Sequence, residues 1–228
     1  ACGSRARTRG AIEPATGVPR REQRLVCAGR ELSDDEEPLT HALPAGLTAD
    51  ITLIRRDPLQ AEWMVKVVEN PWALIGAPEA AKADPEVVLA AIREAPPTLQ
   101  YATFEIRANR GVVLAAVKQL GQVLQHAAPE LRADRKVVLA AVRQCGSALQ
   151  YADAALACDE ETALAAVSQD GDALQHVAPE LRARRHVVLA AVRRNSSALL
   201  YAEKEFWVDP ELRRLAGWPA VGAGGQGA

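Results

Sequence analysis

Apolar residues in the second half of the chain recur with a long and constant spacing. A block reading VVLAA followed by Val or Ile begins at positions 87, 112, 137 and 187, and the related TALAAV begins at 162. A leucine follows twelve positions later each time, at Leu99, Leu124, Leu149, Leu174 and Leu199. Residues 124–152 and 174–202 are identical at 22 of 29 positions. This period of 25 residues is typical of repeat proteins, whose units bury their apolar faces only against each other.

The apolar block of each unit predicts a helix of about ten residues. Residues that can cap a first turn precede it in four units: Asp84, Asn109, Asp134 and Asp159. Pro85 suits the first helical position. We expect the helix to end near Gly121, Gly146 or Gly171, each acting as a left-handed C-terminal cap. Because VVLAAV is apolar all round, this helix should be covered on several sides.

A second, shorter helix is predicted to begin near Ser147 or Asp172. It places Leu149, Ala152 and Leu156 on one face. Pro129 and Pro179 lie six residues into the corresponding segments, where a helix must either end or restart as a separate turn. The sequence therefore predicts a mainly α fold, an α-solenoid of stacked two-helix units of 25 residues.

The ends of the predicted solenoid differ from its regular units. We expect a degenerate first unit at 57–86, regular repeats at 87–203 and a partial last unit at 204–218. All four tryptophans lie outside the regular units: Trp63, Trp72, Trp207 and Trp218. Together with Phe206 they are predicted to close the open ends of the core, because terminal repeats need different residues. The Gly-rich residues 219–228 are predicted to be disordered.

The repeats resemble a known family. In that family, 25-residue helical units carry VVLAAV, a glycine and ALQYA in this order, as residues 85–205 do here. The family is known as domain of unknown function 4116. The resemblance implies the helical repeat fold and brings no activity, substrate or catalytic residue.

Residues 17–56 do not follow the pattern of the repeats. RLVCAGREL from Arg24 to Leu32 and DITLIRR from Asp50 to Arg56 predict strands, the second with alternating apolar and polar residues. The segments GVP, QRL, AGREL and PLTHALP, followed by a strand with basic residues, resemble the second half of ubiquitin-like domains. We therefore expect a partial ubiquitin-like β-grasp module here. Residues 1–16 are basic and are expected to be disordered or to end a truncated helix.

The ubiquitin-like resemblance implies a binding surface. Leu25, Val26 and Ile54 occupy the places of the family's exposed apolar patch, and Arg30 takes the place of a lysine used for chain building. Because the chain continues past Arg56 as DPLQAEWM, this module is not expected to be a conjugated modifier. A rival interpretation is that the solenoid covers these apolar side chains.

Composition narrows the possible partners. The chain of 228 residues has a formal net charge of −2, although its first thirty residues hold seven Arg against two Glu. This balance disfavours a dedicated nucleic-acid or membrane binder, and no apolar run reaches the length of a membrane span. The four cysteines show neither metal-ligand spacing nor a disulfide framework. We expect an intracellular protein, cytoplasmic or nuclear, without cofactor or metal, and take a monomer as the default.

No motif predicts catalysis, so we expect no enzyme, although an unrecognised enzyme stays an alternative. The alternating Tyr101, His126, Tyr151, His176 and Tyr201 are expected to pack between units with their polar tips outward. Two polar series recur once per unit and are candidates for partner binding. One consists of Gln100, Gln125, Gln150 and Gln175, and the other of Arg93, Lys118, Arg143 and Arg193. Both could equally be solvated surface.

These features predict a non-enzymatic adaptor that binds an unidentified protein partner. The alternative is single-stranded RNA binding, since helical repeats can read one base per unit and each unit offers Gln beside Tyr or His. Composition disfavours this alternative. Residues 87–202 hold 13 Lys and Arg against 11 Asp and Glu, a net charge of +2 that is low for a surface tracking phosphates.

Overall fold

The computed structural model describes residues 14–27, 30–31 and 51–219. The chain forms two compact units, residues 1–70 and residues 71–228. The predicted domain boundary at Arg56 differs from this division, because the helix that follows Arg56 belongs with the strands. The predictions for residues 1–13 and 220–228 lie outside the described residues.

The first unit is a small antiparallel sheet with a helix. Its elements are η1 (Arg20–Glu22), β1 (Gln23–Cys27), β2 (Arg30–Glu31), β3 (Ile51–Arg55) and α3 (Pro58–Glu69). The strand order is β2-β1-β3, and Leu25 lies opposite Leu53 in the pairing of β1 with β3. Asp57 caps α3 by accepting from the backbone N–H groups of Leu59 and Gln60. A mainly α chain with a small β module is therefore confirmed.

The core of this unit is formed by a few fully buried side chains. Leu25 of β1 and Ala61 and Val67 of α3 are 0% exposed. Gln23 is also buried and donates from Nε2 to the carbonyl of Val18 at 3.0 Å. Glu22 accepts from Arg55 Nε at 2.8 Å and so ties η1 to β3. These contacts hold the two longer strands and the turn before them together.

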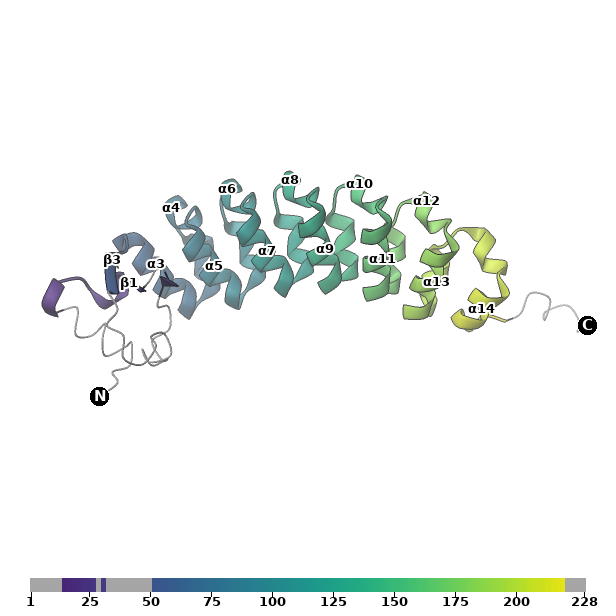
Figure 1. Cartoon of the computed structure of the whole chain (residues 1–228), viewed down its shortest axis with the longest axis horizontal. Coiled ribbons are helices and arrows are strands. Elements are labelled where there is room, and N and C mark those ends of the chain that lie inside the picture. Colours follow the sequence, from purple (N-terminus) through teal and green to yellow (C-terminus); the bar gives the residue numbers. More distant parts are fainter. Residues whose placement is uncertain (1–13, 28–29, 32–50, 220–228) are drawn as a thin grey trace, which may run out of the picture. The chain divides into compact units, whose positions relative to one another are not determined.

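The second unit repeats three helical segments every 25 residues (Figure 1). The long helices are α5 (Pro85–Glu94), α7 (Arg110–Gln119), α9 (Arg135–Gln144), α11 (Glu160–Gln169) and α13 (Arg185–Arg194). Each is followed by a 3₁₀ helix, and η2 precedes them: η2 (Pro71–Gly76), η3 (Pro96–Tyr101), η4 (Gly121–His126), η5 (Gly146–Tyr151), η6 (Gly171–His176) and η7 (Ser196–Tyr201). Between them lie the short helices α4 (Glu79–Lys82), α6 (Phe104–Arg107), α8 (Pro129–Arg132), α10 (Ala154–Ala157) and α12 (Pro179–Arg182).

The predicted two-helix unit is wrong in one respect. The segment after the long helix is not one short α-helix but a six-residue 3₁₀ helix followed by a separate four-residue helix. Pro129 and Pro179 each stand at the first position of such a short helix. Proline suits this first position because it has no N–H for the preceding turn, but Phe104 and Ala154 occupy the same place in the neighbouring units, so the break does not depend on proline.

The long helices begin where their capping residues predict. Asp84, Asn109 and Asp134 each accept from two N–H groups of the first helical turn, and Asp159 accepts from Thr162 N. Arg184 occupies the same place before α13 and makes no side-chain cap. Local capping thus explains the start of four of these ten-residue helices.

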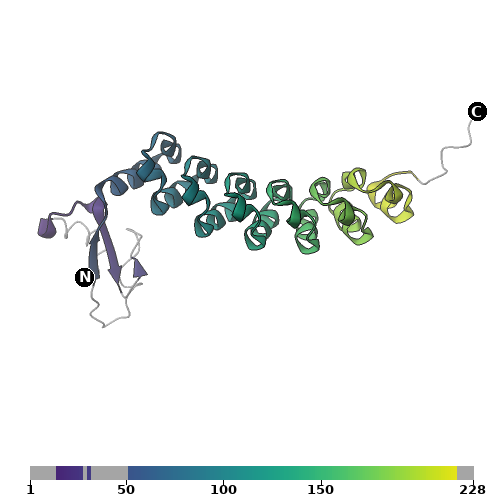
Figure 2. The same cartoon turned by 90° about the horizontal axis from the view of Figure 1, so that it is seen from above.

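The units stack so that like elements contact like. Each long helix contacts the next long helix, each 3₁₀ helix contacts the next 3₁₀ helix, and the two layers face each other. Figure 2 shows the helices of this unit nearly end-on as parallel rows. Leu99, Leu124, Leu149, Leu174 and Leu199 are at most 2% exposed and fill the space between the layers. The short helices lie along one edge (Figure 1), where Ala128 N donates to Arg107 O and Asp153 N donates to Arg132 O, both at 2.9 Å.

The glycines are not the left-handed caps that the sequence predicts. Among glycines of the described residues, positive φ angles occur at Gly17 and Gly217. Gly121, Gly146 and Gly171 instead open the 3₁₀ helices, and a Cβ on Gly146 would lie 2.4 Å from the carbonyl oxygen of Ala166 in the next long helix. A glycine is required here because only a residue without Cβ permits this approach between units.

The C-terminal end of the stack is covered by η8 (Lys204–Val208) and α14 (Pro210–Ala216). Phe206 and Leu212 are buried there, and Trp207 donates from Nε1 to Leu199 O at 2.9 Å. The Trp207 and Trp218 rings meet edge to face, with centroids 6.2 Å apart. At the other end, Trp72 is 44% exposed, so the prediction that it covers the core is wrong. Leu74, two residues later, is the buried side chain of η2.

Candidate interaction surfaces

The apolar patch predicted on the front unit is divided between two faces of its sheet. Leu25 is fully buried, Val26 is half-buried and Ile54 is 44% exposed. Leu25 pairs with Leu53, whereas Arg24 pairs with Ile54 and Val26 with Thr52. Successive residues of a strand point to opposite faces, so Leu25 cannot share a surface with Val26 and Ile54. The assignment of Leu25 to an exposed patch is therefore wrong.

The predicted basic series lies on the long helices. Arg93, Lys118, Arg143 and Arg193 are all exposed and lie in the last turns of α5, α7, α9 and α13. Cations are favourable at this end of a helix, where the backbone carbonyls leave a partial negative charge. Arg143 also approaches Glu161 of the next unit, with 3.9 Å between Nη2 and Oε1. This row is exposed, and the helix termini already offer a structural reason for its charge.

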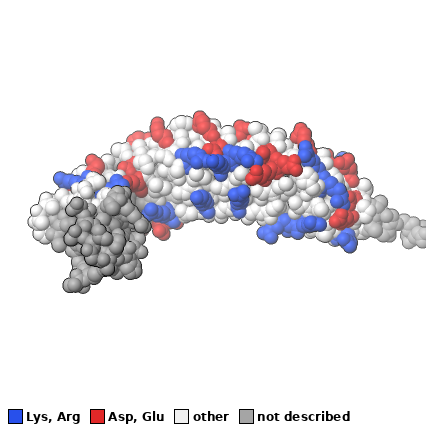
Figure 3. Space-filling model, in the orientation of Figure 1, with Lys and Arg blue, Asp and Glu red and all other residues white. Residues whose placement is uncertain are grey.

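The opposite ends of the long helices carry ion pairs between consecutive units. Arg110 Nε lies 2.8 Å from Asp134 Oδ2, and Arg135 Nη2 lies 2.6 Å from Glu161 Oε2. The Arg110 guanidinium lowers the pKa of Asp134 below its usual value, chiefly through this hydrogen bond. Arg185 pairs with Asp209 and so links α13 to the capping helix α14. Figure 3 shows the resulting succession of basic and acidic side chains along this unit.

Glutamines at the ends of the long helices join the units more directly. Gln169 Oε1 accepts from Gly146 N at 2.6 Å, while its Nε2 donates to Gln144 O at 3.2 Å. Gln144 makes the same two bonds to Gly121 N, at 2.6 Å, and to Gln119 O, at 3.0 Å. Sequence reasoning missed these residues, although their spacing of 25 and the glycine that follows two residues later were visible signals.

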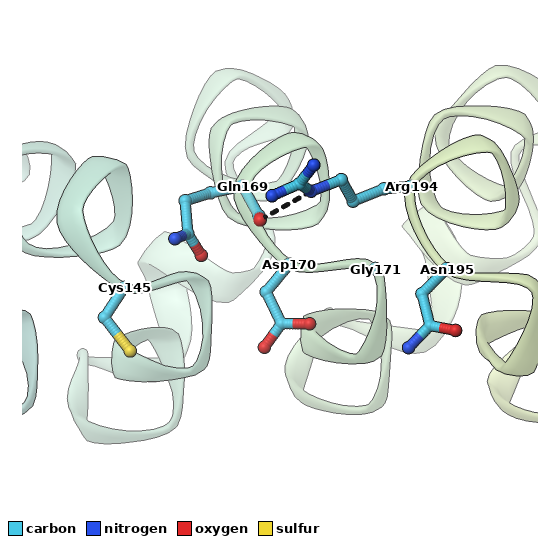
Figure 4. A pocket seen from close by; sticks show the side chains of 6 residues that line it. All are labelled: Cys145, Gln169, Asp170, Gly171, Arg194 and Asn195. Atoms are coloured by element: carbon cyan, nitrogen blue, oxygen red, sulfur yellow. Dashed lines mark hydrogen bonds between the residues drawn. The ribbon is translucent and has the colours of Figure 1, made fainter.

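A pocket of about 380 Å³ lies beside the last of these junctions. Its lining residues are Cys145, Gln169, Asp170, Gly171, Arg194 and Asn195. Figure 4 shows the side chains of Cys145, Asp170 and Asn195 in a row from successive units, with Arg194 reaching back to the carbonyl of Gln169.

The polar groups of this pocket are largely engaged in stacking. Arg194 Nε donates to Gln169 O at 2.9 Å, and Asn195 Nδ2 donates to Asp172 Oδ2 at 2.8 Å. Arg194 occupies the position at which the preceding units have a bridging glutamine. Like those glutamines, it donates to a backbone carbonyl of the unit before it. The pocket is therefore best explained as a junction between units in which Arg194 replaces the bridging glutamine of the preceding units.

The predicted glutamine series lies in the other layer. Gln100, Gln125, Gln150 and Gln175 are exposed residues of η3, η4, η5 and η6. Within the described residues, Gln150 donates to Ser147 O at 3.1 Å, and the other three amides make no hydrogen bond. The structure therefore does not bring the basic and glutamine series together on one layer, since one belongs to the long helices and the other to the 3₁₀ helices.

A row of rings accompanies the glutamines. Tyr101, His126, Tyr151, His176 and Tyr201 each end a 3₁₀ helix and are half-buried. Burial lowers the pKa of both His126 and His176, and the charge of Arg107 adds to this effect at His126. Trp72 extends the row at its first end, because its ring meets that of Tyr101 edge to face at a centroid distance of 6.4 Å. Burial therefore favours the neutral form of both imidazoles.

Two negative findings apply to the part of the chain that the structure describes. No group of three or more His, Cys, Asp or Glu side chains there has an arrangement that could hold a metal ion. No helix there has the length and apolar character needed to cross a membrane.

Comparison with known proteins identifies the repeats. The family model for a domain of unknown function, DUF4116, matches residues 109–156 and residues 159–207. These two stretches are similar to the DUF4116 family model. Each DUF4116 match begins at a capping residue, Asn109 or Asp159, and spans two 25-residue units. No match was found among curated proteins or among solved structures.

Proposed function

We propose that this protein is a non-enzymatic scaffold that binds a partner protein along its DUF4116 repeats. The observation that carries the proposal is the contrast between two kinds of recurring polar side chain. Gln144 and Gln169 are used to join units, whereas Gln100, Gln125 and Gln175 recur at the same interval, are exposed, and make no hydrogen bond within the described residues. Such a periodic, unengaged row is what an extended binding surface offers.

The electrostatics of the repeats also support a scaffold. Strongly perturbed ionisable groups are candidates for catalysis unless structural contacts account for them. Here the lowered pKa values of Asp134 and Asp159 follow from hydrogen bonds to Arg110 and Thr162 respectively, together with their capping bonds. These groups therefore have a complete structural explanation.

Single-stranded RNA binding is the second candidate, and the ring row is the observation that favours it. Bases stack on rings, and each unit supplies one Tyr or His beside a glutamine. A phosphate backbone would also need cations beside the rings. Two arginines do lie close to the rings: the charge of Arg107 acts on His126, and Arg182 Nη1 donates to Tyr201 O at 3.4 Å. The exposed basic series, however, belongs to the other layer, and residues 87–202 carry a net charge of only +2, so we rank RNA binding second to a protein partner.

For the front unit we propose a ubiquitin-like module whose contact surface includes Val26 and Ile54. The antiparallel pairing of β1 with the closing strand β3 supports this proposal, as does the 44% exposure of Ile54. Leu25 has no part in it.

The scaffold proposal is tested by direct binding. The full chain and two quadruple variants serve as bait: Gln100, Gln125, Gln150 and Gln175 to Ala, and Arg93, Lys118, Arg143 and Arg193 to Gln. Captured proteins are identified by mass spectrometry, produced separately and titrated calorimetrically against all three baits. We expect at least one captured protein to bind the wild-type chain directly and to bind one of the two variants more weakly. If no purified protein binds, or if capture disappears on RNase treatment, the scaffold proposal is wrong.

A further inference from the structure

The face of the 3₁₀ layer combines two chemistries in parallel rows. One row consists of exposed amides and the other of half-buried rings, and within each unit the ring directly follows the amide in sequence. A Gln side chain supplies two N–H donors and one acceptor, and a Tyr hydroxyl supplies one further donor. The rings contribute flat apolar surface. A ligand for this face should therefore present carbonyl acceptors and compact apolar groups at regular intervals.

The two ends of the amide row carry apolar residues. Counting back and forward by 25 from the glutamines gives Ile75 and Leu200, which are 50% and 56% exposed. Trp72, which is 44% exposed, lies beside Tyr101 at the first end. The face is thus longer than the glutamine series predicts, and its ends favour apolar contact.

The spacing of the units selects the conformation of the ligand. Consecutive long helices contact each other, and α-helices in contact have axes about 8–10 Å apart, so the 3₁₀ helices of the same units should recur at about this distance. A polyproline II helix advances about 9.3 Å in one turn of three residues, so every unit would meet the same side of it. A β-strand presents the same side about every 6.6–6.8 Å and would lose register by the second unit.

We propose that the 3₁₀ face binds a proline-rich segment of a partner protein in the polyproline II conformation, one turn of the ligand for each 25-residue unit. Pyrrolidine rings pack on the Tyr and His rings, and the glutamine amides donate to ligand carbonyls, which have no internal hydrogen bonds in this conformation. Proline lacks an N–H, so a face rich in donors suits it. This proposal rests on the proposed scaffold function and names the class of its partner.

The test uses the full chain and oligoproline peptides of nine, twelve and fifteen residues. Calorimetric titration is compared with a Gly-Ser peptide, an acidic peptide and oligouridylate, each of matched length. We expect oligoproline to bind and affinity to rise with each addition of three residues. Amide NMR spectra should shift at the residues of η3, η4, η5 and η6.

The variants locate the binding. The quadruple Gln100, Gln125, Gln150 and Gln175 to Ala variant should bind at least about twentyfold more weakly, since each lost hydrogen bond costs about two- to tenfold. Replacing Arg93, Lys118, Arg143 and Arg193 by Gln should leave oligoproline affinity within about twofold. Circular dichroism verifies that both variants fold, which is expected because all eight side chains are exposed.

Three results would overturn the proposal: no oligoproline binding at millimolar concentration, equal losses in both variants, or preference for the acidic peptide or oligouridylate. A purified partner that binds the chain through a segment without proline would also overturn it while leaving the scaffold function intact. A scaffold that binds no protein at all is a separate outcome, so the two failures are distinguishable.

Discussion

The two layers of the repeat unit treat their exposed polar side chains differently. On the long helices, Arg110, Arg135 and Arg185 each pair with a carboxylate of the following unit. On the 3₁₀ helices, glutamines recur with the same period and cross to no neighbouring unit. Periodicity alone thus does not distinguish a structural row from a binding row. The partner atoms do, because a side chain already bonded to its neighbour has less to offer a ligand.

The comparison extends to the electrostatic character of the layers. The long helices carry paired charges of both signs, whereas the glutamine amides are uncharged and burial favours the neutral form of His126 and His176. Surface ion pairs individually contribute little free energy. The pairs on the long helices should therefore add little stability and serve mainly to align each unit with the next. The free energy of stacking comes mainly from the buried apolar side chains, the leucines among them, which the close approach at the glycines brings together.

The largest expected effect concerns that close approach. Gly146→Ala places a methyl group against the carbonyl oxygen of Ala166, which belongs to backbone and cannot move aside alone. We expect a loss of about 3 kcal/mol in the free energy of unfolding, measured by urea denaturation.

Gly111→Ala is the matched control for this prediction. A Cβ at Gly111 would meet Asn109 Oδ1 at 3.4 Å, an ordinary contact on the exposed side of α7. Alanine is the better helix former, so this variant should be stabilised by about 0.5 kcal/mol. A small effect at both glycines would contradict the view that glycine spaces the units.

A smaller effect is expected for the bridging glutamines. Gln169→Ala removes the acceptor of Gly146 N, a buried group, and the donor to Gln144 O. An unsatisfied buried N–H should cost about 1–2 kcal/mol of unfolding free energy. Gln125→Ala in the 3₁₀ layer should change it by less than about 0.5 kcal/mol, since Gln125 is exposed and has no such bonds. Equal losses for the two variants would remove the distinction between the rows.

The smallest expected effect is a pH dependence that separates the layers. Burial lowers the pKa of His126 and His176 in the folded state. Their contribution to stability is therefore complete above about pH 6.5, the pKa in the unfolded chain, and is lost as the pH falls through their lower pKa values in the folded state. The pKa of Asp134 is lowered by Arg110, so its contribution is lost only below about pH 4.

Urea midpoints measured across pH test this separation. A variant with His126 and His176 replaced by Tyr, the residue of the neighbouring units, should keep its midpoint from pH 7 to pH 5. Asp134→Asn should change only the acid end of the profile. A wild-type midpoint that is constant down to pH 4 would show that the histidines are not desolvated.

Several features followed from the sequence because they depend on short-range chemistry. The period of 25, the ten-residue helices and their starts at Asp84, Asn109 and Asp134 required only apolar spacing and capping. The division of Leu25 from Val26 could also have been foreseen, since adjacent strand residues face opposite ways. The ubiquitin-like resemblance instead grouped Leu25 with Val26 and Ile54 in one exposed patch, which this alternation does not allow.

Other features were decided only by the tertiary structure, because they depend on the distance between units. Gly146 reads as a helix cap in the sequence, yet its role arises from Ala166, twenty positions later and one unit away. Gln150 and Gln169 are equally periodic in the sequence, but only Gln169 lies within hydrogen-bond reach of its neighbouring unit. Sequence spacing determines which residues share a row, whereas the packing of one unit on the next determines which rows are used in stacking and which remain available to a partner.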